Sequence, residues 1–336
     1  MRRGKTLKRA LAMLTAAVIA TGAAAKPPRP AAPHLRAQDT IGDLLASPVL
    51  AGFAERILPW AGRRYDTTMR LGEMAALLPY HSHVDRGAVV AGLNRLIDDA
   101  NAGRQVFYPV YPEADRRARP DLAEAGLFLF RGEPGAPFAV ISPGGGFSYV
   151  GTVHEGFPYA VEISQQGYNA FVLTCRTGQG GAGATRDLAA ALTFVFEHAA
   201  ELEVGTEGYS LWGSSAGARM AAAIGSHGPA AFGGANLPRP AAVVMAYTGH
   251  SEVTGDEPPT FVVVGENDRI APADRMERRV QALRAAGIEV EYHRFEGVGH
   301  GFGTGIGTSA QGWIGEAVGF WKRVLDPARK PAARDR

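Results

Sequence analysis

The chain has 336 residues, 46% of them hydrophobic and 20% charged, a composition that excludes a disordered chain and is ample for one large core. Basic residues outnumber acidic residues by 35 to 33, but five basic and no acidic residues fall within residues 1–25, so the remainder has 30 against 33 and a net charge of −3. This balance excludes nucleic acid as an expected partner.

Residues 1–25 have the pattern of a secretory signal peptide. Basic residues, including the pair Arg2-Arg3, precede an apolar run at 10–20, and small residues lead up to an expected cleavage after Ala25. The apolar run is short for a membrane span of about 20 residues, so an uncleaved anchor is the less favoured alternative. We expect a periplasmic or secreted protein without stable membrane insertion after cleavage. The arginine pair leaves twin-arginine export open beside the general route.

Two segments precede the main pattern and one follows it. Residues 26–39 are rich in proline and predict a disordered spacer. Residues 40–104 show helical periodicity, with Asp85 as an expected N-cap, and predict a helical extension or cap. Residues 327–336 predict a flexible tail. Cys175 is the single cysteine, which excludes an internal disulfide, and we expect it as a core thiol.

Residues 105–326 alternate short β-rich runs with helical runs. This pattern is typical of a mostly parallel central sheet with helices on both faces, the α/β class. The expected strands are residues 106–110, 127–130, 138–141, 170–173, 209–212, 242–245, 261–264 and 290–295. The expected helices are residues 155–166, 185–201, 215–226, 273–286 and 309–325.

The run Gly213-Ser214-Ser215-Ala216-Gly217 follows an expected strand and precedes an expected helix. It has the pattern of a nucleophile elbow, in which a strand turns sharply into a helix and exposes a hydroxyl on the turn. Glycine on either side gives room for so tight a turn. Ser214 is a neighbouring hydroxyl, but only Ser215 is central to the two glycines. We therefore expect Ser215 to be the nucleophile.

A serine hydroxyl near neutral pH needs a base and a group that orients the base. Asp268 lies in the loop after the strand at 261–264, and His300 lies between glycines after the strand at 290–295. Serine, acid and histidine in this order match the α/β-hydrolase triad. Asp256 and Glu266 are alternative acids, but Asp256 precedes its strand and Glu266 stands immediately at its end. We expect Asp268 to be the acid.

Three consecutive glycines directly follow the strand at 138–141. Such a loop allows close backbone approach, so the amides of Gly145 and Gly146 can point at the oxygen of a tetrahedral intermediate. The amide of Ala216, directly after the expected nucleophile, is the third expected donor. These residues form the predicted oxyanion hole.

Four other polar residues invite a functional interpretation. His154 and Glu155 follow the glycine loop and either border the leaving-group side or cap the next helix. His81 and His83 have a spacing found in metal sites, but no further ligand cluster accompanies them. We expect solvated loop histidines, no metal and no cofactor.

These motifs resemble the α/β-hydrolase superfamily over about residues 105–325, and within it the hormone-sensitive-lipase-like esterases and the acetyl-xylan or feruloyl esterase-like enzymes. The resemblance implies the α/β-hydrolase fold, with Arg176 and Asp187 as a structural pair. Pro143 stands where the lipase-like group has histidine, and Ser214 where that group has aspartate. The carbohydrate-esterase-like group therefore fits better.

The sequence predicts an exported serine carboxylesterase that hydrolyses short-chain acyl esters through an acyl-enzyme, with small-molecule or carbohydrate esters as substrates. Only 53 residues separate Ser215 from Asp268 and 32 separate Asp268 from His300, which leaves no room there for a large lid and favours small acyl groups. A serine peptidase of the same fold and a catalytically silent binding protein are the alternatives. The complete set of triad residues counts against the silent protein, and the lack of a propeller-like repeat counts against the peptidase.

Overall fold

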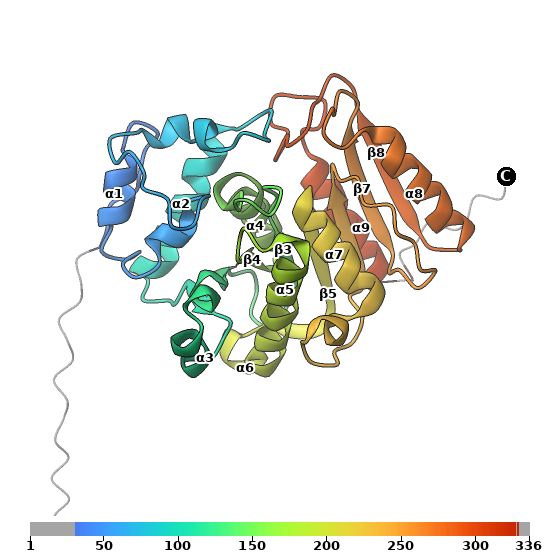
Figure 1. Ribbon diagram of the computed structural model, residues 1–336, viewed down its shortest axis with the longest axis horizontal. Coiled ribbons are helices and arrows are strands. Elements are labelled where there is room, and N and C mark those ends of the chain that lie inside the picture. The colour runs from blue at the N-terminus through green and yellow to red at the C-terminus, as the bar shows by residue number, and fades with distance from the viewer. Residues whose placement is uncertain (1–30, 327, 329–336) are drawn as a thin grey trace, which may run out of the picture. The chain divides into compact units, whose positions relative to one another are not determined.

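In the computed structural model, eight strands of the chain lie in one sheet, in the order β1-β2-β4-β3-β5-β6-β7-β8. Figure 1 shows helices packed around this sheet. The structure describes residues 31–326 and residue 328. The expected signal peptide at 1–25 lies outside the described residues, and so does the expected tail at 327–336 apart from residue 328. No helix in the described part is long and apolar enough to cross a membrane.

The sheet confirms the expected α/β-hydrolase fold class. Strands β3 to β8 pair in parallel, and only β2 runs antiparallel to its neighbours, β1 and β4. All eight expected strands are present, and the largest boundary difference is at β5, which begins four residues earlier than expected. The strands are β1 (Phe107–Pro109), β2 (Gly126–Phe130), β3 (Pro137–Ser142), β4 (Asn169–Thr174), β5 (Gly205–Ser214), β6 (Ala242–Ala246), β7 (Thr260–Gly265) and β8 (Val290–Phe295).

Helices connect the strands and precede the first of them. The expected N-cap of α2 is confirmed, because the Asp85 carboxylate accepts from the amide of Ala88 at 2.6 Å. The α-helices are α1 (Ile41–Ala46), α2 (Arg86–Asn101), α3 (Glu113–Ala118), α4 (Phe157–Gln165), α5 (Gly180–Glu197), α6 (Ala199–Leu202), α7 (Ala216–His227), α8 (Ala273–Ala285) and α9 (Trp313–Leu325). Shorter turns are η1 (Ala54–Ile57), η2 (Leu71–Leu77), η3 (Pro120–Glu124), the π-helical η4 (Thr152–Gly156) and η5 (Pro229–Phe232).

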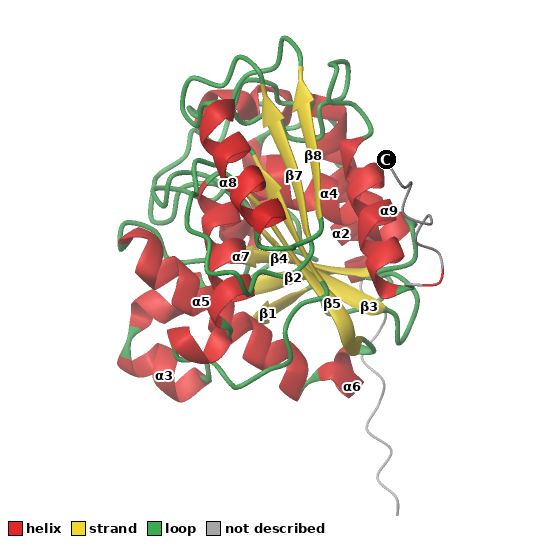
Figure 2. Ribbon diagram, turned by 90° about the vertical axis from the view of Figure 1, so that its right-hand side faces the viewer, coloured by secondary structure: helices red, strands yellow, loops and turns green. Residues whose placement is uncertain are grey.

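Helices cover both faces of the sheet (Figure 2), and the buried side chains form two hydrophobic clusters. One contains side chains of α2, α4 and α9, and the other contains side chains of α5, α7 and α8. Neighbours along a strand point to opposite faces, so Trp212 belongs to the first core and Leu211 to the second. A parallel sheet buried on both faces needs strands that are apolar throughout, which explains the unbroken runs in the sequence.

The N-terminal extension shares the first of these cores. Leu44 in α1 and Leu93 in α2 are fully buried in the same cluster as Trp313 of α9. Helix α2 comes close to α4 because Gly92 has no side chain: a Cβ there would lie 2.7 Å from the Cβ of Phe157. The extension is therefore held by the same apolar contacts as the sheet.

Residues 32–39 differ from the expected spacer at 26–39. The amide of Leu35 donates to Oδ1 of Asn94 at 2.8 Å, and Nδ2 of Asn94 donates to the Leu35 carbonyl at 2.9 Å. The Leu35 side chain is buried. The proline-rich composition predicts disorder because it lacks strand or helix patterning. The backbone N–H and carbonyl of Leu35 are nevertheless hydrogen-bonded, by the side-chain amide of Asn94 on α2 rather than by a neighbouring strand.

Replacing Leu93 with alanine tests whether the extension and the sheet unfold as one unit. We expect Leu93→Ala to lower the free energy of unfolding by about 2–5 kcal/mol, because it leaves a cavity in the shared core. Ala91→Gln on the exposed side of the same helix should change it by less than about 0.5 kcal/mol. Urea titration followed by tryptophan fluorescence and circular dichroism measures both, and a separate early transition would contradict the shared core.

Candidate active site

Ser215 lies at the sharp turn between β5 and α7. Its backbone has φ 50° and ψ −113°, a conformation that strains a residue other than glycine. Its N–H donates to the carbonyl of Ala246 at 2.8 Å, which ties the turn to the end of β6. A Cβ on Gly217 would lie 1.9 Å from the carbonyl oxygen of Ser142, and one on Gly213 would lie 2.4 Å from that of Gly217. The elbow therefore requires glycine at both positions.

The structure brings Ser215, His300 and Asp268 into one hydrogen-bonded chain. Oγ of Ser215 is 2.8 Å from Nε2 of His300, and Nδ1 of His300 is 2.7 Å from Oδ2 of Asp268. Oδ1 of Asp268 accepts from the amides of Ile270 and Ala271 at 2.8 and 2.7 Å. An ionised carboxylate only accepts, so Nδ1 carries the proton and Nε2 is free to accept from the serine hydroxyl. The three side chains follow β5, β7 and β8, at the carboxyl edge of the sheet.

The alternative residues lie elsewhere. Asp256 is exposed, and Glu266 accepts from Nη2 of Arg294 at 3.2 Å. The Ser214 side chain is buried, and its Oγ donates to the hydroxyl of Tyr159 at 3.2 Å. None of the three is paired with His300.

The glycine loop after β3 approaches the elbow with an unusual backbone. Gly145 has φ 135° and Gly146 has φ 63°, values that favour glycine. A Cβ on Gly145 would lie 2.0 Å from the carbonyl oxygen of Tyr149, so no side chain fits there. Within the described chain the amides of Gly145 and Gly146 donate to no protein acceptor. The loop lies beside Ser215, because a Cβ on Gly144 would be 3.1 Å from the Ser215 Cβ.

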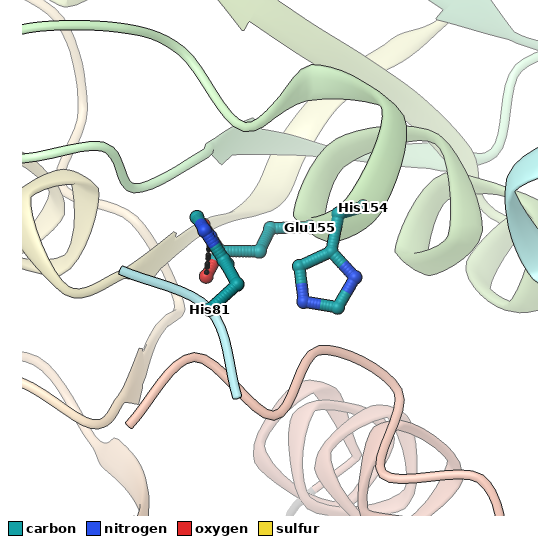
Figure 3. A group of neighbouring side chains, drawn as sticks. All are labelled: His81, His154 and Glu155. Carbon is teal, nitrogen blue, oxygen red and sulfur yellow. Dashed lines mark ion pairs between the residues drawn. The ribbon is translucent and has the colours of Figure 1, made fainter. Parts of the chain in front are cut away.

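A buried carboxylate, Glu155, lies behind this loop. Its Oε2 accepts from the amide of Gly144 at 2.5 Å, and its Oε1 accepts from the hydroxyl of Tyr247 at 2.7 Å. Nε2 of His81 lies 2.9 Å from the same Oε1, as Figure 3 shows. The glycine loop, the end of β6 and the N-terminal extension thus meet at one side chain.

These contacts correct two expectations. Glu155 is fully buried in η4, where it neither borders a leaving group nor caps α4, and the His81 side chain is only 2% exposed rather than solvated. Burial acts to raise the pKa of Glu155, but His81, His154 and the Tyr247 hydroxyl outweigh it and lower the pKa to about 2. Glu155 is therefore ionised across the physiological range. His83, which was also expected in solvent, remains partly exposed and contacts the Ile306 carbonyl at 2.6 Å.

His154 supports the loop that carries His300. Its Nε2 donates to the carbonyl of Gly301 at 3.0 Å, and burial followed by the neighbouring His81 lowers its pKa to about 4. The neutral ring therefore persists at neutral pH. From the other side the amide of Ser82 donates to the carbonyl of His300 at 3.0 Å. The backbone of the His300 loop is fixed by groups from two distant parts of the chain.

Among the residues that the structure describes, His81, His154 and Glu155 form a group that could hold a metal ion, since one ligand atom from each lies within 4.8 Å of the others. Each already has a protein partner: His154 bonds Gly301, and Nδ1 of His81 lies 2.9 Å from the Tyr149 hydroxyl. The Glu155 carboxylate accepts the hydrogen bonds described above. The donor set therefore fits a satisfied hydrogen-bonded cluster better than a coordination sphere.

Cys175 and Arg176 directly follow β4, and Asp187 lies in α5. Arg176 and Asp187 form a buried ion pair with Nη2 2.7 Å from Oδ1, and the Tyr111 hydroxyl donates to Asp187 at 2.7 Å. The side chains join the end of β4 to α5, in keeping with the structural role that the resemblance implies.

Cys175 is a free cysteine, and burial raises the pKa of its thiol. A thiol kept protonated in this way is a poor nucleophile.

A hollow of about 230 Å³ opens beside Ser215 and His300. It lies between the glycine loop and the loop after β7, and its other lining residues include Gly146, Phe147, Thr248, Ile270 and Arg275. It is smaller than the 300–1,000 Å³ common for drug-sized ligands. A small acyl or alcohol group fits such a hollow.

Sequence reasoning missed the network behind the site. Tyr247 and Tyr159 belong to no motif that the sequence analysis identifies. For Glu155 the sequence predicts only a helix cap or a contact on the leaving-group side. The usable signal is a carboxylate just before the largely apolar helical run at 157–163, because a buried charge must be paired. Its partners, however, lie 11, 74 and 92 residues away in the chain, at Gly144, His81 and Tyr247.

The lowered pKa of Glu155 predicts how stability depends on pH. A carboxylate with a pKa of about 2 when folded and about 4.5 when unfolded stabilises the fold above pH 4.5, and this contribution is lost as the pH falls towards 2. We expect Glu155→Gln to lower the free energy of unfolding by about 3 kcal/mol at pH 7, with the deficit shrinking towards pH 2. Denaturant titrations from pH 7 to pH 2 measure it.

Glu162→Gln, on α4, is a control for which we expect a change in the free energy of unfolding of the opposite sign. Burial raises the pKa of Glu162 to about 7, so its ionisation opposes folding as the pH rises from 4.5 to 7. This variant should gain stability relative to the wild type over that range. A Glu155→Gln deficit that stays constant from pH 7 to pH 2 would contradict the buried, ionised state of Glu155.

Comparisons with known proteins agree with this architecture. A family model described as alpha/beta hydrolase fold matches residues 228–304. No curated protein matches the chain significantly in sequence. Among solved structures, the acetyl ester-xyloside bifunctional hydrolase from Caldicellulosiruptor lactoaceticus is 20% identical, with a TM-score of 0.55, over 64% of this chain and 96% of that one.

Two other structures are similar to a comparable degree. MGS-M1, an alpha/beta hydrolase enzyme from a Medee basin deep-sea metagenome library, is 24% identical with a TM-score of 0.52, over 60% of this chain and 93% of that one. The carboxylesterase Cest-2923 from Lactobacillus plantarum is 20% identical with a TM-score of 0.51, over 59% and 92%. The sheet order, the elbow and these similarities together show that the chain has the α/β-hydrolase fold.

Proposed function

We propose that this protein is a serine carboxylesterase that hydrolyses short-chain acyl esters. One observation carries the proposal: the Ser215 hydroxyl is bonded to His300, which is bonded to Asp268, beside a loop with unpaired amides. This arrangement supplies a nucleophile, a base and donors for a developing negative charge within one small hollow. The similar structures support the fold, and the chemistry rests on this geometry.

The reaction would proceed by double displacement. Oγ of Ser215 attacks the ester carbonyl carbon while its proton passes to Nε2 of His300, and Asp268 stabilises the imidazolium. The carbonyl oxygen becomes an oxyanion that accepts from the amides of Gly145, Gly146 and Ala216. Collapse of this intermediate breaks the bond to the alcohol, which leaves with the proton from Nε2. Water then attacks the acyl-enzyme along the same route and releases the acid.

The substrate class follows from the size of the hollow. About 230 Å³ accommodates an acetyl or other short acyl group, and the Ile270 side chain at its rim is exposed. Acetylated carbohydrate is a candidate substrate within this class, and one similar structure bears the name of an acetyl ester-xyloside hydrolase. The signal-peptide pattern of residues 1–25 supports a periplasmic or secreted enzyme.

Replacing the two adjacent serines in turn tests the nucleophile. We expect Ser215→Ala to abolish labelling by a fluorophosphonate probe and to lower kcat for p-nitrophenyl acetate by at least about 10⁴-fold. Ser214→Ala should still be labelled, because its hydroxyl faces Tyr159 rather than His300. Labelling is read by mass spectrometry of the active-site peptide. A wild-type protein that resists the probe would overturn the proposal.

Acyl-chain length tests the size of the hollow. We expect kcat/KM for p-nitrophenyl acetate to exceed that for p-nitrophenyl laurate by at least about tenfold, because a long chain cannot be enclosed beside Ser215. Steady-state rates below the solubility limit of each ester measure the ratio. Equal values for the two esters would contradict short-chain selectivity.

A further inference from the structure

The hollow beside Ser215 adjoins a second hollow that the proposed reaction does not use. The second hollow has a volume of about 300 Å³ and lies against α8. Gly249 and Arg275 line both of them. The two hollows therefore meet at Gly249 and Arg275, on the side of the first hollow that faces α8.

The charged residues that line the two hollows are arginines. Arg219 lines the first, Arg278 and Arg279 line the second, and Arg275 lines both, while neither hollow is lined by aspartate or glutamate. Arg278 is paired with Asp274 at 2.9 Å. In the described part of the chain, Arg219 and Arg275 form no ion pair with a carboxylate. Two exposed guanidinium groups thus flank the site without forming an ion pair, although the charge of Arg275 also acts on the neighbouring Asp274.

Arg279 adds a buried cation. The residue is only 2% exposed, and its Nε and Nη1 are buried without a hydrogen-bond partner. Burial lowers the pKa of Arg279, and the charges of Glu257 and Glu252 offset part of this effect. Neither carboxylate forms an ion pair with Arg279 in the described part of the chain: Glu257 accepts from the amide of Thr254 at 2.7 Å, and Glu252 lies 3.2 Å from His227. A buried guanidinium with free donors is costly unless an anion approaches it.

The pKa of His250, in the loop after β6, is lowered in part by the same arginine charges. Burial, followed by the charges of Arg279 and Arg219, lowers the pKa of His250 to about 4, although Glu252 and Glu257 act in the opposite direction. The imidazole is therefore neutral at neutral pH and adds no charge. The field at the two hollows is set by the arginines.

We propose that the second hollow is a subsite for a carboxylate carried by the ester substrate, held by Arg275, which lines both hollows, and attracted by Arg279 and by Arg219 of the adjoining first hollow. Guanidinium groups bind carboxylates through paired, charge-assisted hydrogen bonds, which suits them to this ligand. The proposal rests on the esterase function and narrows its substrate class. The carboxylate belongs either to the alcohol, as in an acetylated sugar acid, or to the acyl group, as in a half-ester of a dicarboxylic acid.

Matched ester pairs test the subsite. One pair is p-nitrophenyl butyrate and p-nitrophenyl hemisuccinate, whose acyl groups have the same number of carbons and differ by a carboxylate in place of the terminal methyl group. The other is an acetylated methyl glucoside and the corresponding acetylated methyl glucuronide, which differ by a carboxylate on the alcohol. We expect the wild type to prefer the anionic member of one pair, and the pair that shows the preference identifies the source. The preference should weaken as salt is raised.

The double variant Arg219→Gln/Arg275→Gln removes the two exposed guanidinium groups without disturbing the core. We expect it to lower kcat/KM for the preferred anionic ester by about tenfold or more relative to the neutral ester of the same pair. Arg284→Gln, an exposed arginine of α8 that lines neither hollow, is the matched control and should keep the wild-type ratio. An unchanged ratio in the double variant, or no anionic preference in either pair, overturns the subsite.

Binding measured without turnover separates this proposal from the esterase proposal. Calorimetry with Ser215→Ala and glucuronate or succinate as the probe should detect binding that the added double variant weakens about tenfold. If the wild type hydrolyses none of the esters but the probe binds in this way, the esterase proposal fails and the carboxylate site stands. If the esters are hydrolysed without charge preference and neither probe binds, the subsite fails and the esterase proposal stands.

Discussion

The arrangement around Ser215 depends on one buried negative charge, the carboxylate of Glu155. A buried carboxylate must collect donors from wherever the fold can supply them. Here they come from the Gly144 amide, the Tyr247 hydroxyl and the His81 ring. These groups belong to the glycine loop, the residue after β6 and the N-terminal extension, so satisfying one charge fixes the mutual positions of three segments.

The same charge orients a chain of hydroxyls that reaches the nucleophile elbow. Ser214 donates to Tyr159, the Tyr159 and Tyr247 hydroxyls are 2.7 Å apart, and Tyr247 donates to Glu155. Burial and the nearby carboxylate raise the pKa of both tyrosines, so both remain donors. The residue before Ser215 and the loop of its expected oxyanion donors are thus joined by one hydrogen-bonded path. Ser214, where the lipase-like group has aspartate, contributes a neutral donor to this path.

The sequence predicted the features that follow from local geometry. Glycine on either side of Ser215 is required by contacts within a few residues, and Asp268 and His300 follow strands whose carboxyl ends share one edge. The network around Glu155 could not be predicted in the same way, because its partners are up to 92 residues away and are chosen by tertiary packing. His81 illustrates the difference, since it lies in a polar and partly exposed segment but its own side chain is buried beside Glu155 of η4.

Charge shows why composition alone is a poor guide to a substrate. The chain without residues 1–25 has a net charge of −3, which suggests no attraction for anions. Yet the residues that line the two adjoining hollows include four arginines and no acidic residue. Of the nearby carboxylates, Asp274 is paired with Arg278, while Glu257 accepts from the amide of Thr254 and Glu252 contacts His227. A substrate responds to the field within about a Debye length, roughly 8–10 Å in physiological salt, rather than to the total charge. Local placement of the arginines therefore outweighs the acidic balance of the whole chain.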